Sequence, residues 1–132
     1  MAGFSNYLAQ QTISHFIRRS SVSVPSGTYL ALFTADPTDA NITANEVVAS
    51  WYARQNITGW SVPSGTTTST SNSNTISFNV VTGGAITLTH WGIYDAASSG
   101  NLLCSGAMAS AKTLNIDDQF VVDPGELVLD FQ

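Results

Sequence analysis

The chain has 132 residues and a mass of 13.9 kDa, a size that predicts one domain over residues 1–132. Only 10% of the residues are charged, against roughly 25% in an ordinary soluble domain, so we expect a homo-oligomer whose neighbours cover part of the surface, although some β-sandwiches share this composition. The net charge is −5 with four basic residues, Arg18, Arg19, Arg54 and Lys112. This excludes the basic stripe that nucleic-acid binding needs and the basic patch that an anionic membrane attracts.

The first predicted element is a helix or arm in residues 1–20. Ser5 can cap it, and apolar residues recur at steps of three to five positions. Arg18 and Arg19 fall in the last turn, where positive charge suits the helix dipole, and the Ser, Pro and Gly residues of 20–27 end the helix. The apolar face consists of Phe4, Leu8, Ile13, Phe16 and Ile17. Two interpretations remain open: the helix packs on its own domain, or it is an arm that docks on a partner. In the second case Phe4, Leu8, Phe16 and Ile17 are interface residues.

From residue 28 onward the pattern changes to short strands. Residues 29–33 are an apolar run, typical of a strand buried on both faces. Residues 75–80 alternate and place Ile76, Phe78 and Val80 on one face. Further strand-like segments are 52–57, 86–94, 102–104, 112–116, 119–122 and 127–129, whereas 65–74 is a polar loop or hairpin tip. No second helical pattern separates them. We therefore predict a mainly-β fold, an antiparallel β-sandwich or jelly-roll-like domain over 28–132, with an N-terminal α-helix.

Residues that could carry chemistry are sparse. His15 and His90 have no partner at metal-ligand spacing, and the single Cys104 follows two leucines, as a small buried side chain does. There is no G-x-S-x-G nucleophile motif and no phosphate-binding glycine loop. A pair of carboxylates that only the fold brings together stays open as an alternative. We predict no catalytic residue, no metal site, no cofactor and no enzymatic activity.

The tryptophans allow three interpretations. Trp51, Trp60 and Trp91 lie near polar or turn segments. Such residues anchor cores or protein interfaces, which makes Trp51 and Trp60 interface candidates, or they stack on sugars. A sugar-binding surface requires the three side chains to be exposed in a row. The N-terminus lacks the cationic start and apolar core of a signal peptide, so we expect synthesis in a reducing cytoplasm.

Three stretches, in order, resemble a known family. They are Tyr29-Leu30-Ala31-Leu32-Phe33-Thr34-Ala35-Asp36-Pro37-Thr38-Asp39, Tyr52-Ala53-Arg54-Gln55, and Thr89-His90-Trp91-Gly92-Ile93-Tyr94-Asp95-Ala96 running on to Gly100-Asn101-Leu102-Leu103. They are similar to small virion proteins of tailed bacteriophages, often described as tail-fibre-like, some of which look like capsid cement or decoration proteins. The segment Val48-Ala49-Ser50-Trp51 departs from the family's pattern at Trp51.

The resemblance implies a structural role in the virion. The expected function is a capsid cement protein, a homotrimer on the capsid surface that binds the major capsid protein across capsomer seams. The alternative is a tail or tail-fibre component with a receptor- or glycan-binding role, although the chain has no heptads or long repeats for a fibre shaft. Arg54, the charged residue of the second stretch, is expected to pair with a carboxylate such as Asp36 or Asp95, as a structural salt bridge that locks a loop or, alternatively, as a bridge between subunits.

Overall fold

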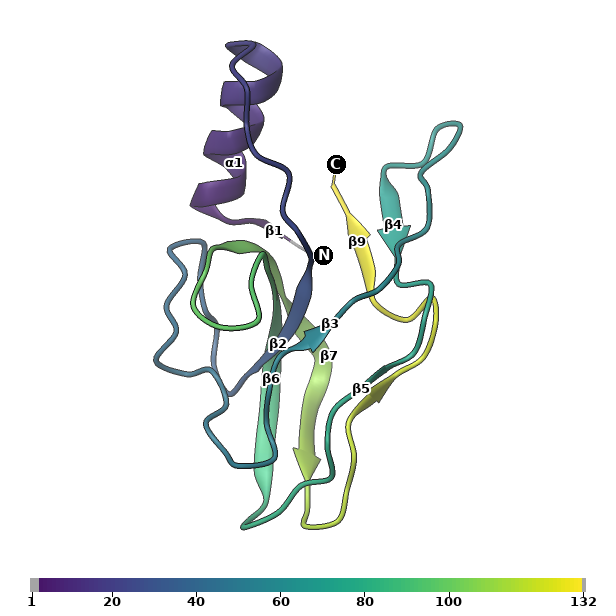
Figure 1. The fold of residues 1–132 in the computed structure, drawn as a ribbon. Helices are drawn as coiled ribbons and strands as arrows, with labels where there is room; N and C mark the ends of the chain where they lie inside the picture. Colours follow the sequence, from purple (N-terminus) through teal and green to yellow (C-terminus); the bar gives the residue numbers. More distant parts are fainter. Residues whose placement is uncertain (1–2, 132) are drawn as a thin grey trace.

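The computed structural model describes residues 3–131; the first two residues and the last residue of the predicted domain lie outside the described residues. The predicted mainly-β fold with one N-terminal helix is confirmed (Figure 1). The helix consists of α1 (Asn6–Thr12) and a π-helical continuation, η1 (Ile13–Ile17). The strands are β1 (Gly3–Phe4), β2 (Tyr29–Phe33), β3 (Gln55–Asn56), β4 (Ser69–Ser71), β5 (Ile76–Ser77), β6 (Ile86–Tyr94), β7 (Leu102–Leu114), β8 (Val121–Val122) and β9 (Val128–Asp130).

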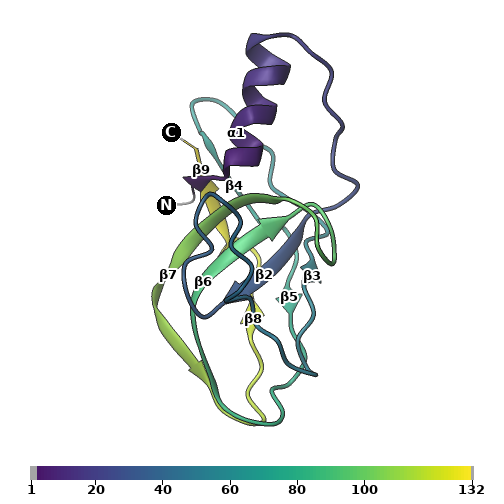
Figure 2. The same ribbon diagram turned by 90° about the vertical axis from the view of Figure 1, so that its left-hand side faces the viewer.

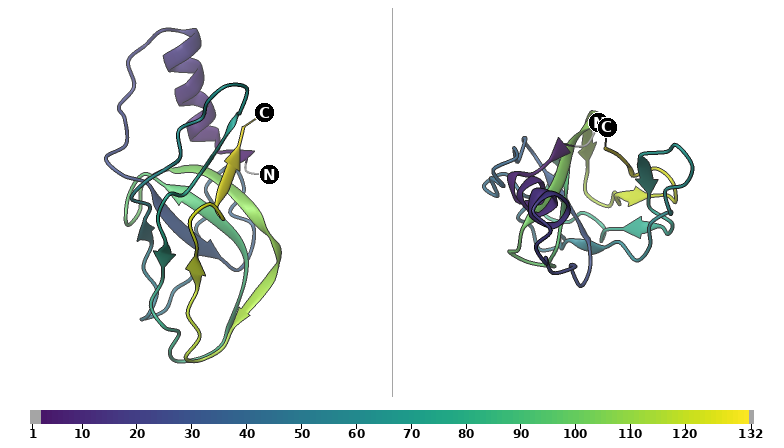
Figure 3. Two further views of the ribbon diagram at one scale, coloured as in Figure 1. Left: turned by 90° about the vertical axis from the view of Figure 1, so that its right-hand side faces the viewer. Right: turned by 90° about the horizontal axis from the view of Figure 1, so that it is seen from above.

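The strands form one antiparallel sheet and two ribbons. The sheet has the order β1-β7-β6-β2-β3, and the long pair β6–β7 is at its centre, with bulges between Leu88 and His90 and between Ile93 and Tyr94. The ribbons β4–β9 and β5–β8 are two-stranded. They lie on one side of the sheet as a second, discontinuous layer (Figures 2 and 3). The structure thus has the two layers of the predicted sandwich, but its second layer consists of two separate ribbons rather than a continuous sheet.

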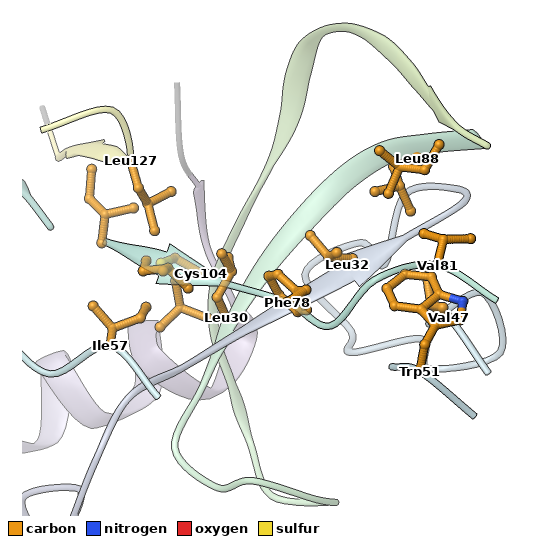
Figure 4. Close-up of a cluster of buried hydrophobic side chains, with 14 residues drawn as sticks. Leu30, Leu32, Val47, Trp51, Ile57, Phe78, Val81, Leu88, Cys104 and Leu127 are labelled. Carbon is orange, nitrogen blue, oxygen red and sulfur yellow. The ribbon is translucent and has the colours of Figure 1, made fainter. Parts of the chain in front are cut away.

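The main core lies between the sheet and the ribbons. Strand β2 contributes Leu30 and Leu32, and the segment that follows β5 contributes Phe78 and Val81 (Figure 4). The other buried members are Val47, Trp51, Ile57, Ile76, Leu88, Ile93, Cys104, Leu114, Leu127 and Leu129. On the opposite face of the sheet, Ala31 and Phe33 form a second cluster with Tyr94 and Leu102. Residues 29–33 are therefore a strand buried on both faces, as predicted.

Three local predictions need correction. Val80 does not share the buried face of Ile76 and Phe78: it is exposed, and Val81 is buried in its place. The reason is that β5 ends at Ser77, after which the amides of Phe78 and Val81 donate to carbonyls of 118–120, so the two-residue alternation does not continue. The segments 102–104 and 112–116, predicted as two strands, belong to a single strand, β7, which ends at Leu114. The polar segment 65–74, predicted as a loop or hairpin tip, contains strand β4, because its backbone pairs with β9 although its side chains carry no apolar pattern.

None of the helices in residues 3–131 is long and apolar enough to cross a membrane.

Candidate assembly surface

The helix is attached to the domain at its base. The amide of Ser5 donates to the carbonyl of Leu103 over 2.9 Å, and its hydroxyl donates to the carbonyl of Leu102. The same hydroxyl oxygen accepts the amide of Leu8 at 3.0 Å, which is the predicted N-cap. Ser5 is 1% exposed. This buried residue therefore joins the first turn of the helix to strand β7.

Phe4 and Leu8 lie at this base. The apolar spacing predicted that Phe4 lies on the helix. The structure instead has it in β1, where it pairs with Cys104. Its ring packs edge-on against Phe131, with the ring centroids 4.6 Å apart. Leu8, on the first turn, is half-buried. Both residues are thus partly covered by their own domain.

The far end of the helix carries exposed apolar side chains, which we call the arm tip: Ile13, Phe16 and Ile17. They are 53%, 71% and 75% exposed, and no residue of α1 or η1 is buried. The helix stands away from the sheets, and the chain returns beside it as an extended segment (Figures 1 and 2). The two interpretations of the helix therefore apply to different parts of it. Its base packs on its own domain, and its tip has an uncovered apolar face.

The tryptophans do not form an exposed row. Trp51 is 5% exposed and belongs to the core, where its ring meets Tyr52 edge-on. Trp60 is half-buried, and its indole nitrogen donates to the hydroxyl of Thr28 over 3.0 Å. Trp91 is also half-buried. The arrangement that the sugar-binding alternative requires is absent from the described residues, and Trp51 is placed as a core anchor.

Arg54 forms an ion pair, but not with the residues expected. Its guanidinium binds both carboxylate oxygens of Glu46 at 2.7 Å, whereas Asp36 and Asp95 bind amides of their own loops. Arg54 also donates to the carbonyls of Ala96 at 3.2 Å and Ser99 at 2.6 Å. The partner was mispredicted because Glu46 lies eight residues earlier, on a loop whose path the sequence pattern does not specify.

Two tyrosines complete this network. The guanidinium carbon of Arg54 lies 3.6 Å from the centre of the Tyr94 ring, and the hydroxyl of Tyr52 donates to Glu46 over 2.7 Å. Burial raises the pKa of Tyr94 to about 12, against the smaller opposite effect of Arg54. Burial also raises the pKa of Tyr52, and the bond to Glu46 raises it further. Every charged group here has an internal partner, so the network is suited to holding loops together rather than to catalysis.

An apolar cleft of about 620 Å³ opens on the ribbon side of the sheet. Its floor includes Leu30, Leu32 and Trp91. One wall is residues 107–113 in the second half of β7, and the other is formed by residues 120–122 and 126–128. No pattern in the sequence pointed to this cleft, because four segments distant in the chain form it.

The described residues bring together no group of three or more His, Cys, Asp or Glu side chains that could hold a metal ion.

A comparison with models of protein families shows which family this chain belongs to. The model of the family described as "Podophage GP4 fiber I protein gp80" matches residues 3–130. The chain belongs to this family. The fibre I family is a family of phage virion proteins, so the resemblance to small virion proteins of tailed phages is confirmed at that level, and the chain is a phage virion structural protein. No curated protein matches the chain.

Proposed function

We propose that this chain is a non-enzymatic fibre subunit at the tail of a short-tailed phage, and that it acts through contacts with other virion proteins. The observation that carries the proposal is the match to the fibre I family over residues 3–130. The description of that family names a fibre protein of a podophage. It therefore supports the tail-fibre alternative over the capsid cement role.

The geometry suits a subunit that is held by its neighbours. The two-layered domain is a rigid body, and the helix projects from it with Phe16 and Ile17 uncovered. Burying each of these side chains in a partner would contribute about 1.5–3 kcal/mol. When several copies act together, such contacts give firm attachment although each is weak. The structure offers no exposed tryptophan row, so we propose an attachment role within the fibre rather than glycan binding.

The capsid cement role stays a second candidate because of one observation. The chain has no heptads or long repeats from which a fibre shaft is built. In this role the chain would be a homotrimer that binds the major capsid protein across capsomer seams. The chain would then stabilise only the assembled shell, by mass action.

Immunogold labelling of intact virions distinguishes the two roles. An antibody raised against the purified chain should label only the tail end of the particle. Labelling over the whole head would contradict the fibre proposal and favour the cement role. Particles that lack the chain, made from a phage with an amber codon in its gene, are the matched control for non-specific labelling.

A further inference from the structure

Two features of residues 3–131 have no partner within that described part of the chain. The first is the arm tip, in which Ile13, Phe16 and Ile17 are more than half exposed. The helix has seven residues in α1 and five in η1, and isolated helices shorter than about 12–15 residues are marginal in water. Since no residue of this helix is buried in the domain, its own packing adds little. Contact with a partner would stabilise it.

The second feature is the apolar cleft beside β7. Its floor lies at the buried residues Leu30 and Leu32, and the apolar side chains that it leaves open to a partner include Val121 and Val128, which are 40% and 51% exposed. Within the described residues, the part of β7 beyond Ser105 pairs only with β6, and β8 pairs only with β5. The cleft thus lies between two strands whose other edges are unpaired. An apolar groove of this kind accepts the apolar face of a helix.

The charges of the two features are complementary. Residues 3–35 contain Arg18 and Arg19, next to the arm tip, and no acidic residue. Residues 120–122 and 126–128, which form one wall of the cleft, belong to the segment 117–130, which contains no basic residue. Its five acidic residues are Asp117, Asp118, Asp123, Glu126 and Asp130. Two charged residues line the cleft itself, Glu126 of this segment and Lys112 on the opposite wall in β7. The basic helix end therefore matches the wall formed by the acidic segment rather than the β7 wall, which favours this pairing over contact between two like surfaces.

We infer that the arm tip of one copy docks in the apolar cleft of a second copy. The inference rests on the proposed function, in which the chain is an assembled virion subunit, and it identifies the partner as the chain itself. Ser5 and β1 fix the base of the helix to the first residues of β7, and the helix projects from that end of the domain (Figure 1). The cleft lies along the second half of β7. A contact between two different patches is heterologous, so repeating it closes a ring or extends a filament.

Cysteine cross-linking between differently tagged copies tests the contact directly. Phe16→Cys in one copy and Val121→Cys in the other place thiols on the arm tip and on the cleft wall, where both native side chains are exposed. Native Cys104 is buried and should not compete. Mild oxidation of the mixture should give a disulfide between the two tagged chains. Val62→Cys, at an exposed site outside the cleft, replaces Val121→Cys as the control and should give none.

Sedimentation of the purified full chain measures the strength of the contact. The double variant Phe16→Ser/Ile17→Ser should raise the dissociation constant of self-association about tenfold or more, because it removes the apolar anchors. Val24→Ser removes an equally exposed apolar side chain outside the helix and should have little effect. Added salt should also weaken the association.

Three results would overturn the inference. They are a chain that stays monomeric at all concentrations, an oligomer that the arm-tip variant does not weaken, and a Phe16→Cys/Val121→Cys disulfide that forms only within one chain when both substitutions are present in it. A monomeric chain found at the tail refutes this inference alone. A self-associating chain found over the head refutes the fibre proposal alone.

Discussion

At the scale of single residues, Arg54 connects the loop that contains Glu46 to the distant loop between β6 and β7. It binds Glu46 from the loop before it, and it reaches the carbonyls of Ala96 and Ser99 in the loop between β6 and β7. The side chains of Arg54 and Glu46 are 5% and 14% exposed. A bidentate pair in such a place has little competition from water, but removing one partner leaves the other charge buried and uncompensated.

Replacing Arg54 with Ala should therefore lower the free energy of unfolding by about 3–5 kcal/mol. Arg54→Lys should recover only a small part, since an ammonium group cannot bind both carboxylate oxygens and two carbonyls at once. Urea denaturation of the purified chains measures both effects. Val62→Ala, at a side chain that is 85% exposed, is the control and should change stability by less than about 0.5 kcal/mol. An Arg54→Ala protein as stable as the wild type would contradict the role assigned to this network.

Two buried side chains that hold their protons in the folded protein should make it less stable at alkaline pH. Burial raises the pKa of Cys104 from 9.0 to about 12 and that of Tyr94 from 10.0 to about 12. At a pH between the two pKa values of Cys104 or of Tyr94, the group has lost its proton in the unfolded chain but keeps it in the folded chain. The free energy of unfolding should therefore fall as the pH rises from about 9 to 12, by up to about 1.4 kcal/mol per pH unit for each group.

Urea titrations at several pH values check this slope. The Cys104→Ala variant should lose stability less steeply above pH 9 than the wild type, whatever its stability at pH 7. Val81→Ala, which shortens a buried side chain that binds no proton, should leave the slope unchanged. A stability that does not depend on pH in this range would refute the assignment of buried, protonated side chains.

At the scale of elements, the pair β6–β7 is held close by a small residue. A methyl group placed on Gly106 would come within 2.7 Å of the ring of Trp91. The ring is rigid and half-buried, so it cannot move aside freely. Gly106 and Trp91 are cross-strand partners, so the ring of Trp91 occupies the space that a side chain at position 106 would need.

Gly106→Ala should accordingly destabilise the protein by about 1–3 kcal/mol through overpacking. Gly84→Ala is the matched control: a methyl group there meets no atom within 4 Å, and Gly84 does not have a positive φ. Thermal unfolding of the two variants should separate them clearly. Equal melting temperatures would show that Trp91 is not fixed in the position described.

Short sequence patterns predicted the presence of helices and strands more accurately than they predicted the lengths of these elements. The N-cap at Ser5 and the doubly buried strand at 29–33 follow from short-range chemistry and from an uninterrupted apolar run, and both are confirmed. The alternation at 75–80 failed at Val80 because the pairing with β8 covers only two residues. The partner of Arg54 and the apolar cleft depend on how distant loops meet, and a linear pattern does not contain that information.

At the scale of the whole molecule, the uneven distribution of charge supports assembly. The arm has only positive charges, while the part of the chain from residue 36 onward contains all nine acidic residues. A chain with so few charges has a weakly hydrated surface, and its uncovered apolar residues at the arm tip and in the cleft favour association. Head-to-tail docking would cover both features in every copy except those at an open end. A virion appendage of repeated subunits requires such a contact.

The most direct test of the account is the number of copies of this chain in purified, intact virions, measured by quantitative mass spectrometry against the major capsid protein. A fibre subunit at the tail should be present in a small number of copies, set by the symmetry of the tail. Hundreds of copies, in proportion to the capsid protein, would contradict the fibre assignment and establish the cement role instead. Absence of the chain from the particle would contradict both.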